Sequence, residues 1–378
     1  MRRVRSIALV LALGASSACS TLGSAPGQPE GLPHGGTGPF RLAQAEEVDV
    51  PPTPPGSTLF ERTRAVENGM VAEGFLFYAG ADPLEIEMPD AGMPDDAGAI
   101  DDAGTIDDAG TDAGTADAGP PPPEGPLEID WSVFEPRVIV RSAPRDEGLG
   151  FDAGSEVLAA THEWEGGFVR DPWAVALEDS RALLYYAAEG GIGVAQAASI
   201  DGSFVKVGTA PVIAGDVRRP TVIETRGTEA EHAFLMYFER DGTLVGASSG
   251  DGLAWVEIGT LDLPALAARD SRDAEEIAIG GPGVVAARTE AGRAVIRLYY
   301  ESRRSDGQVL ITMAGSFDGV TFEPLRIPVV QDRALRWPAP RQIDPRVTLL
   351  YMQGERGGRG AERGALLVGI APAGVTLP

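Results

Sequence analysis

The sequence predicts an all-β fold, a five-bladed β-propeller with four strands in each blade. Three observations support this prediction: a unit of short apolar strands recurs, each copy opens on a proline, and each second strand carries an aromatic residue. The four clearest copies open at Pro172, Pro220, Pro282 and Pro338, which lie 48, 62 and 56 residues apart. Such periods with four strands each are typical of propeller blades, which bury both apolar faces only by packing radially on their neighbours.

The chain begins with a segment typical of an export signal. Residues 1–19 hold three arginines within the first five positions and then an apolar run (7–15) that is too short to span a bilayer as a helix. Small residues follow the run up to Cys19, the single cysteine of the chain. This arrangement resembles a bacterial lipoprotein signal, although Ser16 stands where such signals favour Leu. An ordinary secretory signal is the alternative.

The resemblance implies that Cys19 becomes the lipidated mature N-terminus and anchors the protein in the cell envelope through the membrane. Ser20 follows the cysteine where inner-membrane retention favours Asp, so the outer membrane is the expected location. A periplasmic or secreted protein is the alternative location.

Two segments have compositions that do not support a folded core. Residues 20–56 are rich in Gly, Pro, Ser and Ala and predict a flexible linker. Residues 89–123 repeat a DDAG unit and hold nine aspartates with no basic residue among them. Without an apolar face, this tract predicts a disordered insertion in a surface loop of the propeller domain, residues 57–378. It lacks the ligand spacing of an EF-hand or of a Gly-rich calcium repeat.

The first blade is expected upstream of the four clear copies, with the insertion inside it. Residues 68–74 and 75–82 are typical of its first two strands, with Tyr78 at the aromatic position, and residues 127–140 of its third-to-fourth hairpin. The last blade lacks a fourth strand, so residues 57–66 are expected to supply it and close the ring. A β-sandwich with long hairpins is the competing fold.

The later copies repeat one order of strands. Their second strands are ALLYYAA, AFLMYFE, VIRLYYES and TLLYMQG, with the aromatic position at Tyr186, Tyr237, Tyr300 and Tyr351. A small apolar third strand follows, then an Asp-Gly pair and a fourth strand; the pairs begin at Asp201, Asp251 and Asp318. Asp-Gly between apolar runs predicts a type I′ hairpin turn, which needs positive φ at both central residues.

Charge and composition exclude several function classes. The chain has 56 acidic and 31 basic residues and a formal net charge of −25, which argues against nucleic acid as a partner. One cysteine and three histidines exclude an intramolecular disulfide and a Cys- or His-rich metal site. No metal or other cofactor is therefore expected, and the protein is expected to be a monomer.

One copy resembles a known superfamily. Arg170-Asp171-Pro172, a following strand with Leu-Tyr-Tyr and the hairpin at Ser199–Gly202 resemble the five-bladed β-propeller glycosidases, which include arabinanases, levansucrases and invertases. Residues 316–322 resemble the same hairpin. The resemblance covers roughly residues 130–352 and implies a glycan or oligosaccharide as the ligand.

In that superfamily three carboxylates on inner strands face the central cavity, as a nucleophile or base, a transition-state stabiliser and a general acid. The resemblance assigns Asp171 to the stabilising position. The other two positions depart from the pattern: Glu67 or Asn68 stands at the first, and Glu224 and Asp216 are the nearest carboxylates to the third. Because hydrolysis needs an acid and an opposing carboxylate, the catalytic set is incomplete.

Other residues are candidates for ligand contacts. Arg219 offers a bidentate donor, Trp337 is a candidate for stacking on a sugar ring, and Trp173 and Asn68 are further candidates for ligand binding. Arg219 is equally consistent with neutralising Asp171, and Trp337 with packing at a blade junction. Glu163 and Glu165 flank Trp164 and are expected at the mouth of the cavity.

Two main function classes remain open from the sequence. In the first, an envelope-anchored propeller binds an extracellular glycan or oligosaccharide. If it is an active enzyme, it also hydrolyses that ligand. In the second, a non-catalytic propeller mediates protein or surface interactions. A purely structural surface lipoprotein is a third, minor class.

Overall fold

The computed structural model describes residues 41–47, 67–73, 75–81, 136–144, 151–152, 154–263, 274–288, 293–325, 328–330, 335–344, 347–355 and 363–371. The export signal, the Asp-rich tract at 89–123 and residues 57–66 lie outside these ranges.

The described strands form five antiparallel sheets. The first contains β2 (Glu67–Ala72), β3 (Phe75–Ala81), β4 (Pro136–Ser142) and β5 (Ser155–Ala159). The second contains β6 (Arg170–Ala176), β7 (Ala182–Ala188), β8 (Gly191–Ala197) and two short strands that both pair with β8, β9 (Val205–Lys206) and β10 (Ile213–Ala214). The third contains β11 (Arg218–Glu224), β12 (Phe234–Arg240), β13 (Thr243–Ser249) and β14 (Trp255–Thr260).

The fourth sheet contains β15 (Glu276–Arg288), β16 (Ala294–Arg304), β17 (Val309–Ser316) and β18 (Glu323–Pro324). The fifth contains β19 (Arg336–Asp344), β20 (Val347–Glu355), β21 (Arg363–Ala371) and β1 (Arg41–Glu47). A single 3₁₀ turn among the described residues, Glu163–Glu165, precedes β6.

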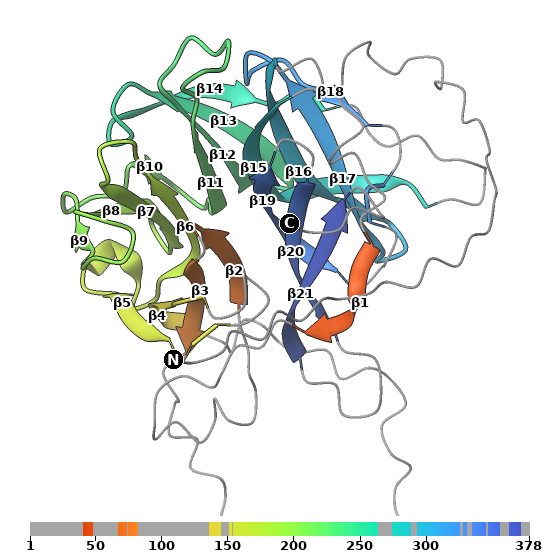
Figure 1. Cartoon of the computed structure of the whole chain (residues 1–378). Coiled ribbons are helices and arrows are strands. Elements are labelled where there is room, and N and C mark those ends of the chain that lie inside the picture. The colour runs from red at the N-terminus through yellow and green to blue at the C-terminus, as the bar shows by residue number, and fades with distance from the viewer. Residues whose placement is uncertain are drawn as a thin grey trace, which may run out of the picture.

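The opening strand of each sheet lies at the centre of the molecule. Strands β2, β6, β11, β15 and β19 contact one another in that order, and β19 contacts β2. Figure 1 shows the sheets radiating from this centre. The predicted all-β propeller with four-stranded blades is therefore confirmed.

The second strands carry the core because each is sandwiched between neighbouring sheets. All seven residues of β7 are buried. Tyr185 and Tyr237 are fully buried, and their hydroxyls donate to the carbonyls of Gly252 and Gly319 in the next sheet at 2.7 and 2.6 Å. A buried tyrosine usually finds such a partner. The repeated aromatic residue and the repeated Asp-Gly pair thus form one contact between blades.

The register moves the aromatic position by one residue in three sheets. The first residue paired after each bulge lies opposite Phe77, Tyr185, Tyr237, Tyr299 and Tyr351. These are therefore the equivalent residues, and the predicted positions Tyr78, Tyr186 and Tyr300 are wrong. Two adjacent aromatic residues in each of these three strands made both alignments equally good in the sequence.

The predicted type I′ turns at the repeated Asp-Gly pairs are wrong. Gly252 and Gly319 have positive φ (76° and 75°), but Asp251 and Asp318 do not. The preceding serine explains the difference: Ser249 Oγ accepts the N–H of Gly252 at 2.9 Å, while Asp251 Oδ1 accepts two further backbone N–H groups. Local side-chain acceptors compete with hairpin geometry in this way.

Both chain ends contribute to the fifth sheet, but not as expected. Strand β1 (41–47) pairs with β21, so it supplies the missing strand in place of residues 57–66, and it interrupts the predicted linker at 20–56. Pairing removes an open edge from β21, which otherwise exposes unpaired backbone groups. In the first sheet the third strand is β4 and the fourth is β5, so the expected hairpin within 127–140 is also wrong.

Candidate functional site

Every opening strand carries the same irregularity. The pairing of each with its neighbour shifts register at the equivalent place, between residues 67 and 70, 170 and 173, 218 and 221, 280 and 283, and 336 and 339. Asp171, Arg219, Gly281 and Trp337 occupy this bulge with φ of 51°, 54°, 52° and 53°. The left-handed region costs a non-glycine residue roughly 1–2 kcal/mol. Such strain, repeated at equivalent positions, concentrates at functional sites.

These bulges surround a cavity at the centre of the propeller, here called the axial cavity. It opens to solvent. Its lining comes from all five opening strands: Met70, Asp171, Pro172, Trp173, Arg219, Pro220, Gly281, Pro282, Trp337, Pro338 and Ala339. The structure therefore brings together four residues that the sequence singled out: Asp171, Arg219, Trp337 and Trp173.

Asp171 lies at the wall of the cavity and is 5% exposed. Its Oδ2 accepts the backbone N–H of Arg219 at 3.1 Å. Asp171, in the second sheet, therefore stabilises the left-handed backbone conformation of Arg219 in the third sheet. The guanidinium of Arg219 instead pairs with Glu239, so it does not neutralise Asp171 in the way considered from the sequence.

Glu239, on β12, lies beneath the cavity and is the centre of an ionic cluster. Its carboxylate accepts from Arg219 Nη1 at 2.7 Å, from Arg303 at 2.7 and 2.9 Å, and from the N–H of Gly281 at 3.1 Å. Burial raises the pKa of Glu239, but the charges of Arg219 and Arg303 outweigh burial and lower it to about 2. Glu239 is therefore a permanent carboxylate at neutral pH and no proton donor.

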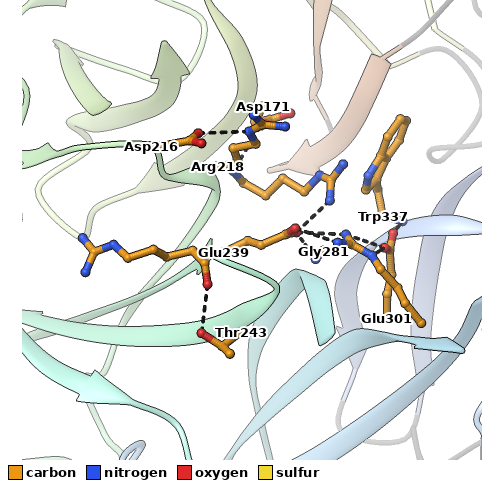
Figure 2. A network of polar contacts seen from close by, with 11 residues as sticks. Asp171, Asp216, Arg218, Glu239, Thr243, Gly281, Glu301 and Trp337 are labelled. Carbon is orange, nitrogen blue, oxygen red and sulfur yellow. Dashed lines mark hydrogen bonds and ion pairs between the residues drawn. The ribbon is translucent and has the colours of Figure 1, made fainter. Parts of the chain in front are cut away.

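Glu301, on β16, completes the cluster and holds Trp337. Its Oε2 accepts from Arg303 Nε and Nη2 at 3.0 and 2.9 Å, and its Oε1 accepts the N–H of Trp337 at 2.8 Å. The guanidinium carbon of Arg219 lies 5.1 Å from the centre of the Trp337 ring. Figure 2 shows Glu239 and Glu301 on either side of Gly281, with the Trp337 indole beside them.

Two glycines make room for this cluster. A Cβ at Gly281 would lie 2.7 Å from the Glu301 carboxyl group, and one at Gly280 would lie 2.3 Å from Glu239 Oε2. The opening strand of the fourth sheet therefore reads Gly-Gly-Pro where three others read Arg-x-Pro. Arg303, from the neighbouring strand, supplies a guanidinium beneath this part of the cavity.

Glu239, Glu301 and Arg303 were not predicted from the sequence. The available signal was a glutamate two residues after the structurally equivalent tyrosine, in YFE and YYE. This position lies opposite the start of the bulge, because Glu239 pairs with Arg218 and Glu301 with Gly280.

Other predicted residues lie elsewhere. Glu224 occupies the opposite end of β11, pairs with Arg226 at 2.9 Å and has its pKa raised by burial and by Asp179. It is absent from the cavity lining, so it cannot act there as the proposed acid. Asp216 pairs with Arg218 at 3.4 Å, and its side chain is 78% exposed.

The backbone of Glu67 and Asn68 lies at the bulge of β2, and their side chains are outside the described part. Glu165 is not at a cavity mouth. It is fully buried, pairs with Lys206 at 2.6 Å and accepts the N–H groups of Thr161 and His162. This carboxylate therefore joins the 3₁₀ turn to β9.

Within the described ranges, no helix is long and apolar enough to cross a membrane. No group of three or more His, Cys, Asp or Glu side chains suited to a metal ion occurs among the same residues.

Comparison with known proteins supports the fold. No family model and no curated protein matches the chain.

A solved structure of a glycosyl hydrolase from Bacteroides ovatus superposes with a TM-score of 0.52 at 14% identity, covering 89% of this chain and 93% of that one. The catalytic domain of an alpha-L-arabinofuranosidase from Coprinopsis cinerea gives 0.48 at 12% identity, covering 90% and 97%. An endo-arabinase from Bacteroides thetaiotaomicron gives 0.47 at 13%, covering 63% and 87%. At 14% identity the likeness to the Bacteroides ovatus protein shows a shared fold alone.

Proposed function

We propose that the axial cavity binds a saccharide, a glycan end or an oligosaccharide. The observation that carries this proposal is the arrangement of an indole, a carboxylate and a guanidinium around one solvent-open cavity. Trp337 offers a flat apolar surface to the C–H face of a sugar ring, and Asp171 accepts hydrogen bonds from hydroxyl groups. Apolar walls with a few placed polar groups are typical of small-molecule sites. The Bacteroides ovatus glycosyl hydrolase of similar fold supports the same ligand class.

Binding is proposed ahead of hydrolysis because of the carboxylates. Hydrolysis needs a proton donor facing a second carboxylate across the scissile bond. Of the described carboxylates, Asp171 alone lines the cavity, while Glu239 is held in its charged form. Glu67 stays the candidate for a second carboxylate in an active enzyme.

We further propose that the five sheets constitute a complete five-bladed propeller. The closed order of contacts among β2, β6, β11, β15 and β19 supports this count. We also propose that Cys19 carries a lipid anchor, so that the propeller is displayed at the cell envelope as a monomer.

Calorimetry against a panel of neutral, acidic and amino oligosaccharides tests the proposed ligand. Asp171→Asn keeps the shape of the side chain and removes its charge, so it should weaken binding by about 1–3 kcal/mol. Trp337→Ala should abolish binding. Asp216→Asn is the matched control, since Asp216 is an exposed carboxylate just before β11 and is outside the cavity lining.

Release of reducing ends, measured on the same panel, separates the two outcomes. Binding without release supports a binding module, and release that Asp171→Asn abolishes supports hydrolysis. If no saccharide binds, or if Asp216→Asn weakens binding as much as Asp171→Asn, the proposal is wrong.

A further inference from the structure

A buried arginine lies between the fourth and fifth sheets, away from the axial cavity lining. Arg297, on β16, is 1% exposed. Its Nη1 lies 3.5 Å from Thr348 Oγ1 on β20, and it also hydrogen bonds to the hydroxyl of Tyr299. Its Nε and Nη2 are buried and have no hydrogen-bond partner among the described residues.

Arg297 differs from the other arginines of the described part. Arg170, Arg219 and Arg304 also have a buried Nε without a partner, but each is partly exposed to solvent and has only that one nitrogen in this state. Arg297 is the one arginine among the described residues that is buried as a whole. Its two neighbours across the strands, Val285 and Gly315, offer it no side-chain acceptor.

The two unpartnered nitrogens are the pair that recognises anions. Nε–H and Nη2–H of a guanidinium point in parallel and bind one anionic group together. Two other arginines of this protein use that edge: Arg303 holds Glu301 with Nε and Nη2, and Arg293 holds Glu229 in the same way. In Arg297 the same edge meets no carboxylate among the described residues.

A buried guanidinium without a counter-charge is expensive. Removing an ion from water is strongly unfavourable even after the protein relaxes, and each unsatisfied buried donor adds to that cost. Hydroxyls partner one side of the guanidinium, and Tyr299 belongs with Leu350 and Met352 to an apolar cluster between these two sheets, which holds no counter-charge. A bound anion would supply both the charge and the two acceptor contacts.

We propose that the Nε–Nη2 edge of Arg297 binds a small inorganic anion of the halide class, enclosed between the fourth and fifth sheets. Because Arg297 is 1% exposed, a group enclosed beside it has to be small. The hydroxyls of Tyr299 and Thr348 lie beside the same guanidinium. The anion stabilises the junction at which the chain-end sheet packs on the fourth sheet.

The thermal midpoint of the full chain tests this proposal when chloride replaces gluconate at constant ionic strength. A ligand that binds only the folded state raises the midpoint with its concentration, here by roughly 3–5 °C at high chloride. Arg297→Met should show no response to chloride. Arg304→Met is the matched control, because Arg304 lies on the same strand with one unpartnered nitrogen, and it should keep the response.

A second measurement needs no variant. Crystals grown with bromide should show an anomalous peak within hydrogen-bonding distance of Arg297 Nε and Nη2. A wild-type midpoint that is equal in chloride and gluconate would overturn the proposal. A chloride response that persists in Arg297→Met would overturn it too, as would bromide that is bound elsewhere and absent from Arg297.

Discussion

The backbone N–H of Trp337 donates to the carboxylate of Glu301 across the boundary between the fifth and fourth sheets, at 2.8 Å. The same contact recurs between Gly281 and Glu239. In both pairs, a carboxylate of one sheet therefore stabilises the residue of the next sheet that has a left-handed backbone conformation. The geometry of the axial cavity depends on pairs of blades, and Arg303 connects two of these pairs.

Arg303→Met should destabilise the protein strongly. The substitution leaves the carboxylates of Glu239 and Glu301 without the cation that they share, and breaking a buried ion pair typically costs about 3–5 kcal/mol. Denaturant unfolding measures the loss. Arg293→Met is the control, because its pair with Glu229 is half exposed and should contribute about 1 kcal/mol or less. Equal losses in the two variants would contradict the role given to Arg303.

Gly281→Ala tests the space beneath the cavity. Alanine is strained in the left-handed backbone conformation, and its Cβ would lie 2.7 Å from the Glu301 carboxyl group. Gly227→Ala is the matched control, since Gly227 also has positive φ (76°) but no atom within 4 Å of the place where a Cβ would lie. The control should lose roughly 1–2 kcal/mol of unfolding free energy, and Gly281→Ala about 1–3 kcal/mol more. A similar loss in both would show that Glu301 moves aside freely.

Glu239 should make the free energy of unfolding depend on pH in the acid range. Its pKa falls from an ordinary 4.5 to about 2 on folding. The unfolded chain therefore binds this proton at a higher pH, so the stabilisation is present above pH 4.5 and is lost as the pH falls from 4.5 towards 2. The loss amounts to at most about 3 kcal/mol.

Urea unfolding across this pH range measures the acid dependence. Glu239→Gln should flatten the curve below pH 4.5 and lower stability at neutral pH. Glu257→Gln, which removes an exposed partner of Arg240, should change the curve much less. An unchanged acid slope in Glu239→Gln would mean that other groups carry it.

The parts of the site that follow from local sequence were predictable. Each opening proline marks the bulge, and the residue before it lines the cavity, so Asp171, Arg219 and Trp337 could be named in advance. The cluster of Glu239, Glu301 and Arg303 could not, because its contacts join strands of different sheets and no local pattern encodes them.

Two errors of fold have different origins, one long-range and one local. Strand β1 (RLAQAEE) has no apolar alternation, and only the open edge of β21 gives it a structure. The Asp251-Gly252 pair has the composition of a type I′ turn, but Ser249 redirects it through its hydroxyl. By contrast, Asp241-Gly242 joins β12 to β13 with φ of 50° and 70°, as that turn requires.

Replacing the single cysteine tests where the propeller is displayed. In a lipoprotein the acylated Cys19 holds the mature chain in the membrane, and more than one acyl chain is enough for stable anchoring. Wild-type protein should therefore appear in the membrane fraction of expressing cells and incorporate labelled palmitate. Cys19→Ser should release it to the soluble fraction without label, while Ser20→Ala should leave both results unchanged. Because both positions lie upstream of β1, the first described strand, we expect neither substitution to change the thermal midpoint. Soluble, unlabelled wild-type protein would contradict the anchor and favour the ordinary secretory signal.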